Sequence, residues 1–171
     1  MRLEAAAVLL VASVTSAEGP RRAEPADPGL SLWFQSRPAE PDDLRFSAAA
    51  ENVEHRLVVK ASIQSTRATP VRIGYGACFS HNVRVRLYRT PDRRAPAVWE
   101  NPSELCTMQL IISIISAQGS VSPRQLQGEI SGRGLPASVP EGTYYATAQI
   151  RLPEPRAMSE EIAVGTIVVI R

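Results

Sequence analysis

Residues 139–152 read VPEGTYYATAQIRL, and this stretch decides the fold class. A Pro-x-Gly turn, from Pro140 to Gly142, leads into a run in which Tyr144 and every second residue after it share one phase. Successive side chains of a strand point to opposite faces, so a period of two predicts a strand with one buried face. An inward Tyr directly after such a turn is typical of the tyrosine corner of immunoglobulin-like and fibronectin-like sandwiches. The plainer interpretation, that Tyr144 is an ordinary core aromatic at a strand start, keeps the same fold.

The same alternation recurs along most of the chain. Strands are expected over residues 30–35, 44–51, 57–64, 71–75, 83–88, 97–100, 108–115, 144–152 and 162–170. The run 108–115 is apolar in both phases, so we expect it to lie centrally or to be covered on both faces. Turn residues such as Pro91-Asp92 and Asn101-Pro102 separate the runs, and no helical pattern is found after the N-terminal segment. Short strands at this spacing predict an all-β fold, a single immunoglobulin-like or fibronectin-III-like antiparallel β-sandwich over residues 30–171.

Length and composition agree with one folded domain. The chain has 171 residues, of which 44% are hydrophobic and 21% are charged, and its net charge is +2. This composition argues against wholesale disorder, and the small charge excess argues against a nucleic-acid-binding protein. Eighteen Arg stand against a single Lys, Lys60. We interpret this bias as that of a GC-rich bacterial genome; selection of Arg for binding phosphate or carboxylate is the alternative.

The N-terminal residues indicate export. Arg2 precedes an apolar run from Ala5 to Val14 that is too short to span a bilayer, and small residues lead up to Ala17. We therefore expect residues 1–17 to be a cleaved signal peptide, with an ordinary N-terminal helix as the alternative. Residues 18–29 are expected to form a flexible leader. The mature protein is then secreted or periplasmic, and no later stretch is apolar enough to predict a membrane span.

Cys78 and Cys106 are the only cysteines of the sequence. Two cysteines in an exported chain most often pair, and this disulfide would close a loop of about 29 residues, stabilising the fold by roughly 3–4 kcal/mol. The alternatives are two inert thiols or a metal site. Cys78 and His81 have metal-ligand spacing, but a closed site would also need Cys106 and the distant His55. We expect the disulfide and no metal.

Residues 52–171 resemble the family of the intracellular proteinase inhibitor of the BsuPI type. The matching segments are Leu57 to Thr66, Pro70 to Gly76, Val83 to Arg89, Ala97-Val98-Trp99, Gln118 to Val121, Leu135 to Ala148 and the closing strand. The resemblance implies an immunoglobulin-like sandwich and, as an activity, proteinase inhibition. It carries over no inhibitory residue.

Catalytic motifs are missing from the sequence. It contains no Gly-x-Ser-x-Gly elbow, no His-Glu-x-x-His and no phosphate-binding Gly loop. A Cys78/His81 dyad is conceivable, but a paired cysteine is not a nucleophile. We therefore predict a non-enzymatic protein without a cofactor. The paired acids Asp42-Asp43 and Glu160-Glu161 lie beside turn residues and are expected to be solvated loop charges.

One strand carries the surface most suited to a partner. Arg84, Arg86 and Tyr88 leave the same face of the run 83–88, a composition favoured in interface cores. The predicted partner-binding residues are Arg84, Arg86, Tyr88, Arg89, Arg93 and Arg94. A plain solvent face in an Arg-biased protein is the alternative interpretation. The hypothesis is an exported immunoglobulin-like domain that binds an unknown protein partner with an acidic patch.

Two other functions stay open. The loop from Thr90 to Pro96 could instead be presented to a proteinase, which is how an inhibitor would act. A small metal-binding or enzymatic protein using Cys78 and His81 is the third possibility.

Overall fold

The protein is an all-β sandwich, as the alternation predicts. The computed structural model describes residues 28–54, 56–103, 109–121 and 126–170. Its strands are β1 (Arg37–Pro38), β2 (Leu44–Val53), β3 (Arg56–Ser65), β4 (Val71–Gly76), β5 (Val83–Tyr88), β6 (Trp99–Glu100), β7 (Leu110–Ile115), β8 (Ser120–Val121), β9 (Gln127–Ile130), β10 (Gly142–Leu152), β11 (Ala157–Met158) and β12 (Ile162–Val169). The helices are α1 (Pro28–Gln35), α2 (Phe79–Asn82), and the 3-10 turns η1 (Pro41–Asp43) and η3 (Gly132–Gly134).

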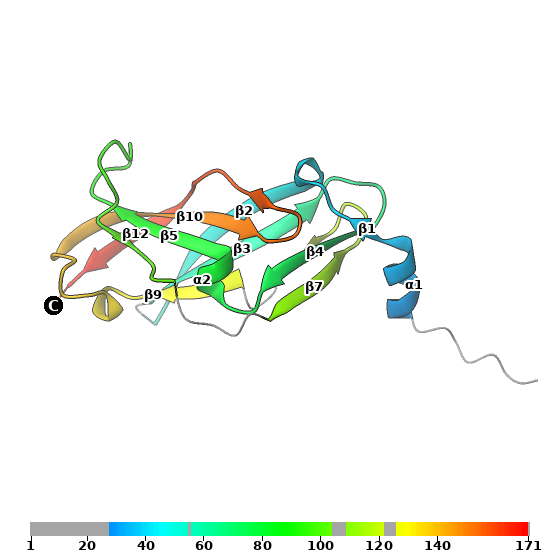
Figure 1. Cartoon of the computed structure of the whole chain (residues 1–171). Coiled ribbons are helices and arrows are strands. Elements are labelled where there is room, and N and C mark those ends of the chain that lie inside the picture. Colours follow the sequence, from blue (N-terminus) through cyan, green and yellow to red (C-terminus); the bar gives the residue numbers. More distant parts are fainter. Residues whose placement is uncertain (1–27, 55, 104–108, 122–125, 171) are drawn as a thin grey trace, which may run out of the picture.

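The strands form two main sheets and a smaller one. In the first sheet β3 pairs with β2 on one side and with β8 and β9 on the other. In the second, β10 lies between β12 and β5, β5 continues to the short β6, and β11 also pairs with β10. Figure 1 shows β5 and β10 lying over the long hairpin of β2 and β3. The small sheet is β1-β4-β7, in which β1 runs parallel to β4.

The core lies between the layers and is built by the alternation of single strands. Val83, Val85 and Leu87 of β5 are fully buried. Every second residue of β3, β4 and β10 joins the same cluster, including Val59, Ala61, Ile63, Val71, Ile73, Tyr75, Ala146, Ala148 and Ile150. Burying each aliphatic side chain of this size contributes about 1.5–3 kcal/mol. The opposite phase of β5 and β10 is therefore left for polar side chains.

The structure confirms the tyrosine corner. Tyr144 is fully buried, and its hydroxyl donates a 2.7 Å hydrogen bond to the carbonyl of Pro140, four residues upstream. Gly142 has a φ of +141°, a conformation that side-chain-bearing residues rarely adopt, so the turn requires glycine there. The Arg89 guanidinium lies 4.7 Å from the centre of the Tyr144 ring and closes the corner from outside.

The expected strand over residues 30–35 is wrong, because residues 28–35 form the helix α1. A proline is tolerated in the first turn of a helix, and Pro28 occupies the first position of α1. Ser36 ends the helix: its N–H donates to Leu32 O at 2.9 Å, and its hydroxyl donates to Trp33 O at 2.8 Å. The helix thus satisfies its own backbone, which a strand without a neighbour would not do. The expected leader 18–29 accordingly overlaps the start of α1 by two residues, and residues 1–27 lie outside the described residues.

The strand β7 is not covered on both faces, contrary to the expectation for residues 108–115. It pairs with β4 and stands at the end of the small sheet. Leu110 and Ile112 are 43% and 48% exposed, whereas Ile115 at the other end of the strand is buried. A run that is apolar in both phases is therefore compatible with an edge strand as well as with a central one.

Asp43 is not the solvated loop charge that its position beside Asp42 indicated. Its side chain is only 2% exposed. It accepts hydrogen bonds from Arg37 Nη2 at 2.7 Å, from the backbone N–H of Glu40 at 2.9 Å, and from Arg67 Nε. The Glu40 N–H and the guanidinium groups of Arg67 and Arg37 together outweigh burial and hold the pKa of Asp43 below its ordinary value. Asp43 thereby joins three segments: β1, η1 and the loop after β3.

The chain passes from the small sheet to the second main sheet through α2. Asn82 at the end of α2 is fully buried and fixes this turn. Its carbonyl oxygen accepts from the N–H of Gly76 at 2.8 Å, and its amide nitrogen donates to the carbonyls of Gly76 at 2.6 Å and Cys78 at 2.8 Å. The start of β5 is thus held at a fixed place beside the end of β4.

Candidate functional site

The outer face of β5 and β10 carries polar side chains, because the alternate residues of both strands point into the core. The register pairs Arg86 with Thr147 and Arg84 with Gln149. Residues opposite each other in a sheet share a face, and so do residues two apart on one strand. Arg151, two residues beyond Gln149, therefore lies on the same face as Arg84 and Arg86. We call this surface, formed by Arg84, Arg86, Tyr88, Thr147, Gln149 and Arg151, the charged face.

Glu161 is the centre of a hydrogen-bond network on the charged face. Its Oε1 accepts from Arg86 Nη1 at 3.0 Å, from the Tyr88 hydroxyl at 2.9 Å and from Thr147 Oγ1 at 3.0 Å. Its side chain is 20% exposed, so the expectation that Glu160-Glu161 is a pair of solvated acids is wrong for Glu161. Burial alone would raise the pKa of Glu161, but the three donors outweigh it and hold the pKa below its ordinary value.

Glu161 raises the pKa of two of its donors, Tyr88 and Arg86. Burial and the hydrogen bond to Glu161 raise the pKa of the Tyr88 hydroxyl. The hydrogen bond to Glu100 and, to a smaller extent, the one to Glu161 raise the pKa of Arg86 further above its ordinary value. The network therefore consists of a fixed carboxylate held by donors that keep their protons at neutral pH.

Glu100 is the acidic partner of both Arg84 and Arg86. It lies on β6, directly opposite Arg86 in the ladder. One of its oxygens lies 2.8 Å from Arg84 Nε and the other lies 2.9 Å from Arg86 Nε, so the carboxylate bridges both guanidinium groups. The predicted strip of Arg84, Arg86 and Tyr88 does share one face, but acids of the chain itself already occupy it.

The three arginines beyond the strip are exposed, and each has a different partner. Arg89 stacks on the Tyr144 ring, as described above, and Arg93 Nη1 donates to the backbone carbonyl of Glu161 at 2.9 Å. Arg94 pairs with Asp92 at 3.3 Å, and its side chain remains 89% exposed. Arg93 thus joins the strip through Glu161, whereas the contacts of Arg89 and Arg94 described above lie elsewhere.

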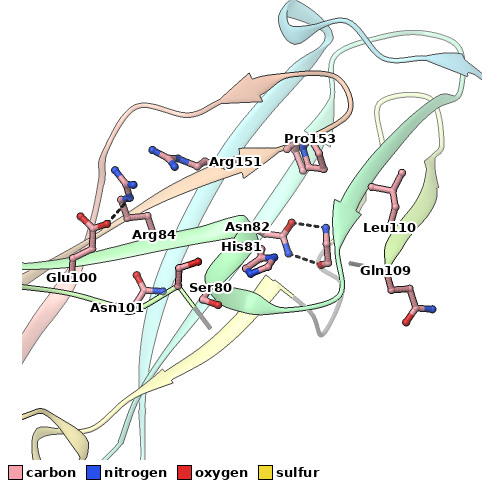
Figure 2. A pocket seen from close by; sticks show the side chains of 13 residues that line it. Ser80, His81, Asn82, Arg84, Glu100, Asn101, Gln109, Leu110, Arg151 and Pro153 are labelled. Carbon is pink, nitrogen blue, oxygen red and sulfur yellow. Dashed lines mark hydrogen bonds and ion pairs between the residues drawn. The ribbon is translucent and has the colours of Figure 1, made fainter. Parts of the chain in front are cut away.

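A cavity of about 580 Å³ opens beside the charged face. It is bounded by α2 and the first residues of β5, by the chain around Glu100, by the start of β7, and by the end of β10. Figure 2 shows Arg84, Arg151 and Glu100 on one side of this cavity, and Leu110 and Gln109 on the other. Two amides of the lining already serve the backbone: Asn82 at the α2 turn, and Asn101, whose Oδ1 accepts from the N–H of Val85 at 2.6 Å.

Arg151 lines this cavity and is not among the partner-binding residues expected from the sequence. Its Nε is buried and has no hydrogen-bond partner within the part of the chain that the structure describes. The alternation places Arg151 in the polar phase of residues 144–152, so the sequence does contain a signal for its outward direction. Its position beside Arg84 depends on the pairing of β10 with β5, which no local pattern reveals.

The structure does not test the predicted cysteine and histidine sites. Cys78 precedes α2, where His81 also lies, but Cys106 and His55 fall outside the described residues. The Cys78–Cys106 disulfide therefore stays a prediction. Across residues 28–54, 56–103, 109–121 and 126–170, no three His, Cys, Asp or Glu side chains gather as a metal site would require. No helix in those ranges has the length and hydrophobicity needed to cross a membrane.

The chain matches no family model and no curated protein. The resemblance to the BsuPI-type inhibitors accordingly stays a prediction.

Proposed function

We propose that the chain is an exported, non-enzymatic immunoglobulin-like domain that binds a protein partner through its charged face and the cavity beside it. The observation that carries this proposal is Arg151: a charged side chain whose buried Nε has no partner among the described residues, at the wall of an open cavity. Arg151 has no acidic partner among the described residues, and a guanidinium in this state at a cavity wall is suited to an anionic group of a partner. Export rests on residues 1–17, and the non-enzymatic character rests on the motifs missing from the sequence.

The rigidity of the surroundings supports a binding role. Arg84 and Arg86 are held by Glu100, and Arg86 is also held by Glu161. The two strands that carry the charged face are central in their sheet and bury their opposite phase completely near the cavity. Side chains ordered in this way before binding lose little conformational freedom when a partner docks.

A capture experiment tests the proposal. The purified chain is immobilised and exposed to the cell-envelope fraction of the source organism, in parallel with the variants R151E and R45E. Arg45 lies on the exposed phase of β2, in the other main sheet, so R45E is a matched control for the change in charge. We expect a protein that wild type and R45E retain and R151E loses. Purified, that protein should bind R151E at least about tenfold more weakly, roughly 1.4 kcal/mol. Equal retention by all three chains would refute a role for the charged face.

A second candidate function is proteinase inhibition, and the loop from Thr90 to Pro96 favours it. Thr90 Oγ1 donates to Asp92 Oδ1 at 2.7 Å, and Arg93 is anchored on Glu161, so Arg94 stands out from a constrained loop. An exposed Arg on a constrained loop suits the acidic primary pocket of a trypsin-like proteinase. Titration of trypsin with the chain tests this: stoichiometric loss of activity that R94A abolishes would favour inhibition, and cleavage of the chain without inhibition would exclude it.

The predicted disulfide is also carried forward as a proposal. The intact mass of the purified chain decides among the three states of the cysteines. A mass two hydrogens below that of the reduced chain corresponds to the Cys78–Cys106 disulfide. Retained metal would instead support the metal-binding alternative through Cys78 and His81, and the reduced mass without metal would correspond to inert thiols.

A further inference from the structure

We infer that the cavity beside Arg151 binds a carboxylate group of a peptide segment, which Arg151 holds. The inference deepens the proposed function and rests on it, because it names the chemical group of the partner that enters the cavity. The argument uses the balance of charges on the charged face, the geometry of a guanidinium and the walls of the cavity.

The charges of this face leave one guanidinium in excess. Arg84 and Arg86 are matched by the carboxylates of Glu100 and Glu161. Arg151 lies on the same face, and no acid among the described residues lies within ion-pair distance of it. A partly buried cation without a counter-charge is unfavourable, and a monoanion in the adjacent cavity would remove that penalty. The excess of one positive charge favours a singly charged ligand over a phosphate dianion.

The donor geometry favours a planar carboxylate. A guanidinium presents its two terminal N–H groups side by side, and this outer edge matches the two oxygens of a carboxylate. Arg151 Nε is buried, so the terminal N–H groups are the donors left for a carboxylate in the cavity. The neighbouring strand already pairs guanidinium groups with a carboxylate, because Arg84 and Arg86 both contact Glu100. A second carboxylate at Arg151 would add another pair of this kind on the same face.

The other walls indicate what accompanies the carboxylate. Leu110, which is 43% exposed, and Pro153 contribute apolar surface to the lining of the cavity (Figure 2). The volume of about 580 Å³ lies within the range of pockets that enclose small ligands. A free C-terminal residue with an apolar side chain offers both features, and an internal Glu side chain offers the carboxylate alone. Both are peptide carboxylates, and the experiment below separates them.

Nuclear magnetic resonance of the arginine Nε–H groups tests the inference on the full purified chain. The probes are N-acetyl-leucine, which carries a C-terminal carboxylate, the α-amide of N-acetyl-glutamic acid, which carries a side-chain carboxylate, and uncharged N-acetyl-leucinamide. The R151Q spectrum assigns the Arg151 resonance by its loss. We expect that resonance to shift saturably with at least one carboxylate and not with N-acetyl-leucinamide. Preference for N-acetyl-leucine identifies a C-terminal group, and preference for the glutamic acid derivative identifies a side chain.

Three variants complete the test. R151Q should weaken binding at least about tenfold, as expected for loss of a bidentate charged pair, and the control R45Q should leave it unchanged. L110E places a competing carboxylate at the opposite wall and should also abolish binding, without altering Arg151. It keeps the test decisive if R151Q does not fold.

The outcomes also separate this inference from the proposed function. No saturable shift at tens of millimolar carboxylate, or an equal response of wild type and R151Q followed by backbone resonances, would overturn the inference. If that happens while the envelope partner is still lost by R151E, the binding function stands and the ligand chemistry is wrong. If carboxylates bind but no partner depends on Arg151, the proposed function fails and the carboxylate site stands.

Discussion

Asp43 and Arg151 are two charged side chains with buried polar atoms, and they differ in their partners. Asp43 accepts hydrogen bonds from Arg37, Arg67 and the backbone of Glu40, and its charge is balanced within the fold. Arg151 Nε is buried without a partner among the described residues, at the wall of a cavity. A buried charge with all of its partners contributes to the structure, whereas a partly buried guanidinium without an acidic partner at a cavity wall is able to pair with a ligand. The following predictions test this difference.

Replacing Asp43 should cause the largest loss of stability. In D43A, the guanidinium groups of Arg37 and Arg67 and the N–H of Glu40 lose their common acceptor at the junction of three segments. D42A is the matched control, because Asp42 is the exposed neighbour. Urea unfolding measures both variants. We expect a large decrease in the midpoint for D43A and a value close to wild type for D42A; equal midpoints would show that Asp43 is not a structural junction.

Acid should destabilise the folded protein by protonating Asp43 and Glu161. The pKa values of Asp43 and Glu161 are lowered in the folded state, so these groups bind protons more readily when unfolded. Their stabilisation is present above the unfolded-state pKa, about 4, and is lost as the pH falls through the folded-state pKa. The unfolding free energy measured from pH 7 to pH 2 should therefore decrease below about pH 4. D43N should flatten this decrease, and an unchanged slope in D43N would contradict the assignment to Asp43.

Replacing Glu161 should cause an intermediate loss of stability. The E161Q side chain still accepts hydrogen bonds but no longer carries the charge that faces Arg86, and Arg86 keeps Glu100 as a partner. We expect a destabilisation of about 1–2 kcal/mol at low salt, as for loss of a charge-assisted hydrogen bond. The exposed neighbour provides the control E160Q, which should change stability little. A greater effect of E160Q than of E161Q would argue against the network.

The tyrosine corner provides an uncharged reference for the comparison. Y144F removes one hydroxyl and leaves the Pro140 carbonyl without its 2.7 Å donor. A loss of about 1 kcal/mol is expected, close to the net value of one hydrogen bond. Y145F removes the same atom from the adjacent, 36% exposed tyrosine and should have almost no effect. Thermal and chemical unfolding of the two variants measure the difference, and its absence would remove the structural role of the hydroxyl.

Replacing Arg151 should change the unfolding free energy least among the residues compared, and no destabilisation is expected. R151M replaces a guanidinium that lacks a partner among the described residues with an apolar side chain that fills similar space, so stability should stay within about 0.5 kcal/mol of wild type or increase. R86M, on the same face, removes the partner of two carboxylates and should destabilise. A loss in R151M as large as that in R86M would show that Arg151 is a structural residue.

Much of the fold could be predicted because it depends on short-range patterns. The alternation of Val83, Val85 and Leu87 with Arg84 and Arg86 assigns each face of β5 correctly, and the tyrosine corner follows from a turn and one aromatic. The two expectations about strands that are wrong also come from short-range patterns. Residues 30–35 alternate over too few positions to exclude a helix, and the apolar run of β7 does not reveal whether a second layer covers it.

The charged face could be predicted only in part. The shared direction of Arg84, Arg86 and Tyr88 was visible from their spacing, whereas their acidic partners were not. Glu161 lies 75 residues from Arg86 in the sequence, and their contact requires β10 to bring the two segments together. The same long-range pairing explains why Asp43 and Glu161, which look like loop acids, are held by several donors.

From its amino acids alone, the chain specifies which side chains turn inward and which turn outward, because this depends on the geometry of a single strand. The tertiary structure decides which charged side chains pair and which one has no acidic partner among the described residues. It does so because strand register sets every contact between segments, and register is a property of the assembled sheets. Asp43 and Arg151 are both charged residues beside a strand or within one, and folding gives the first its partners and places the second at a cavity.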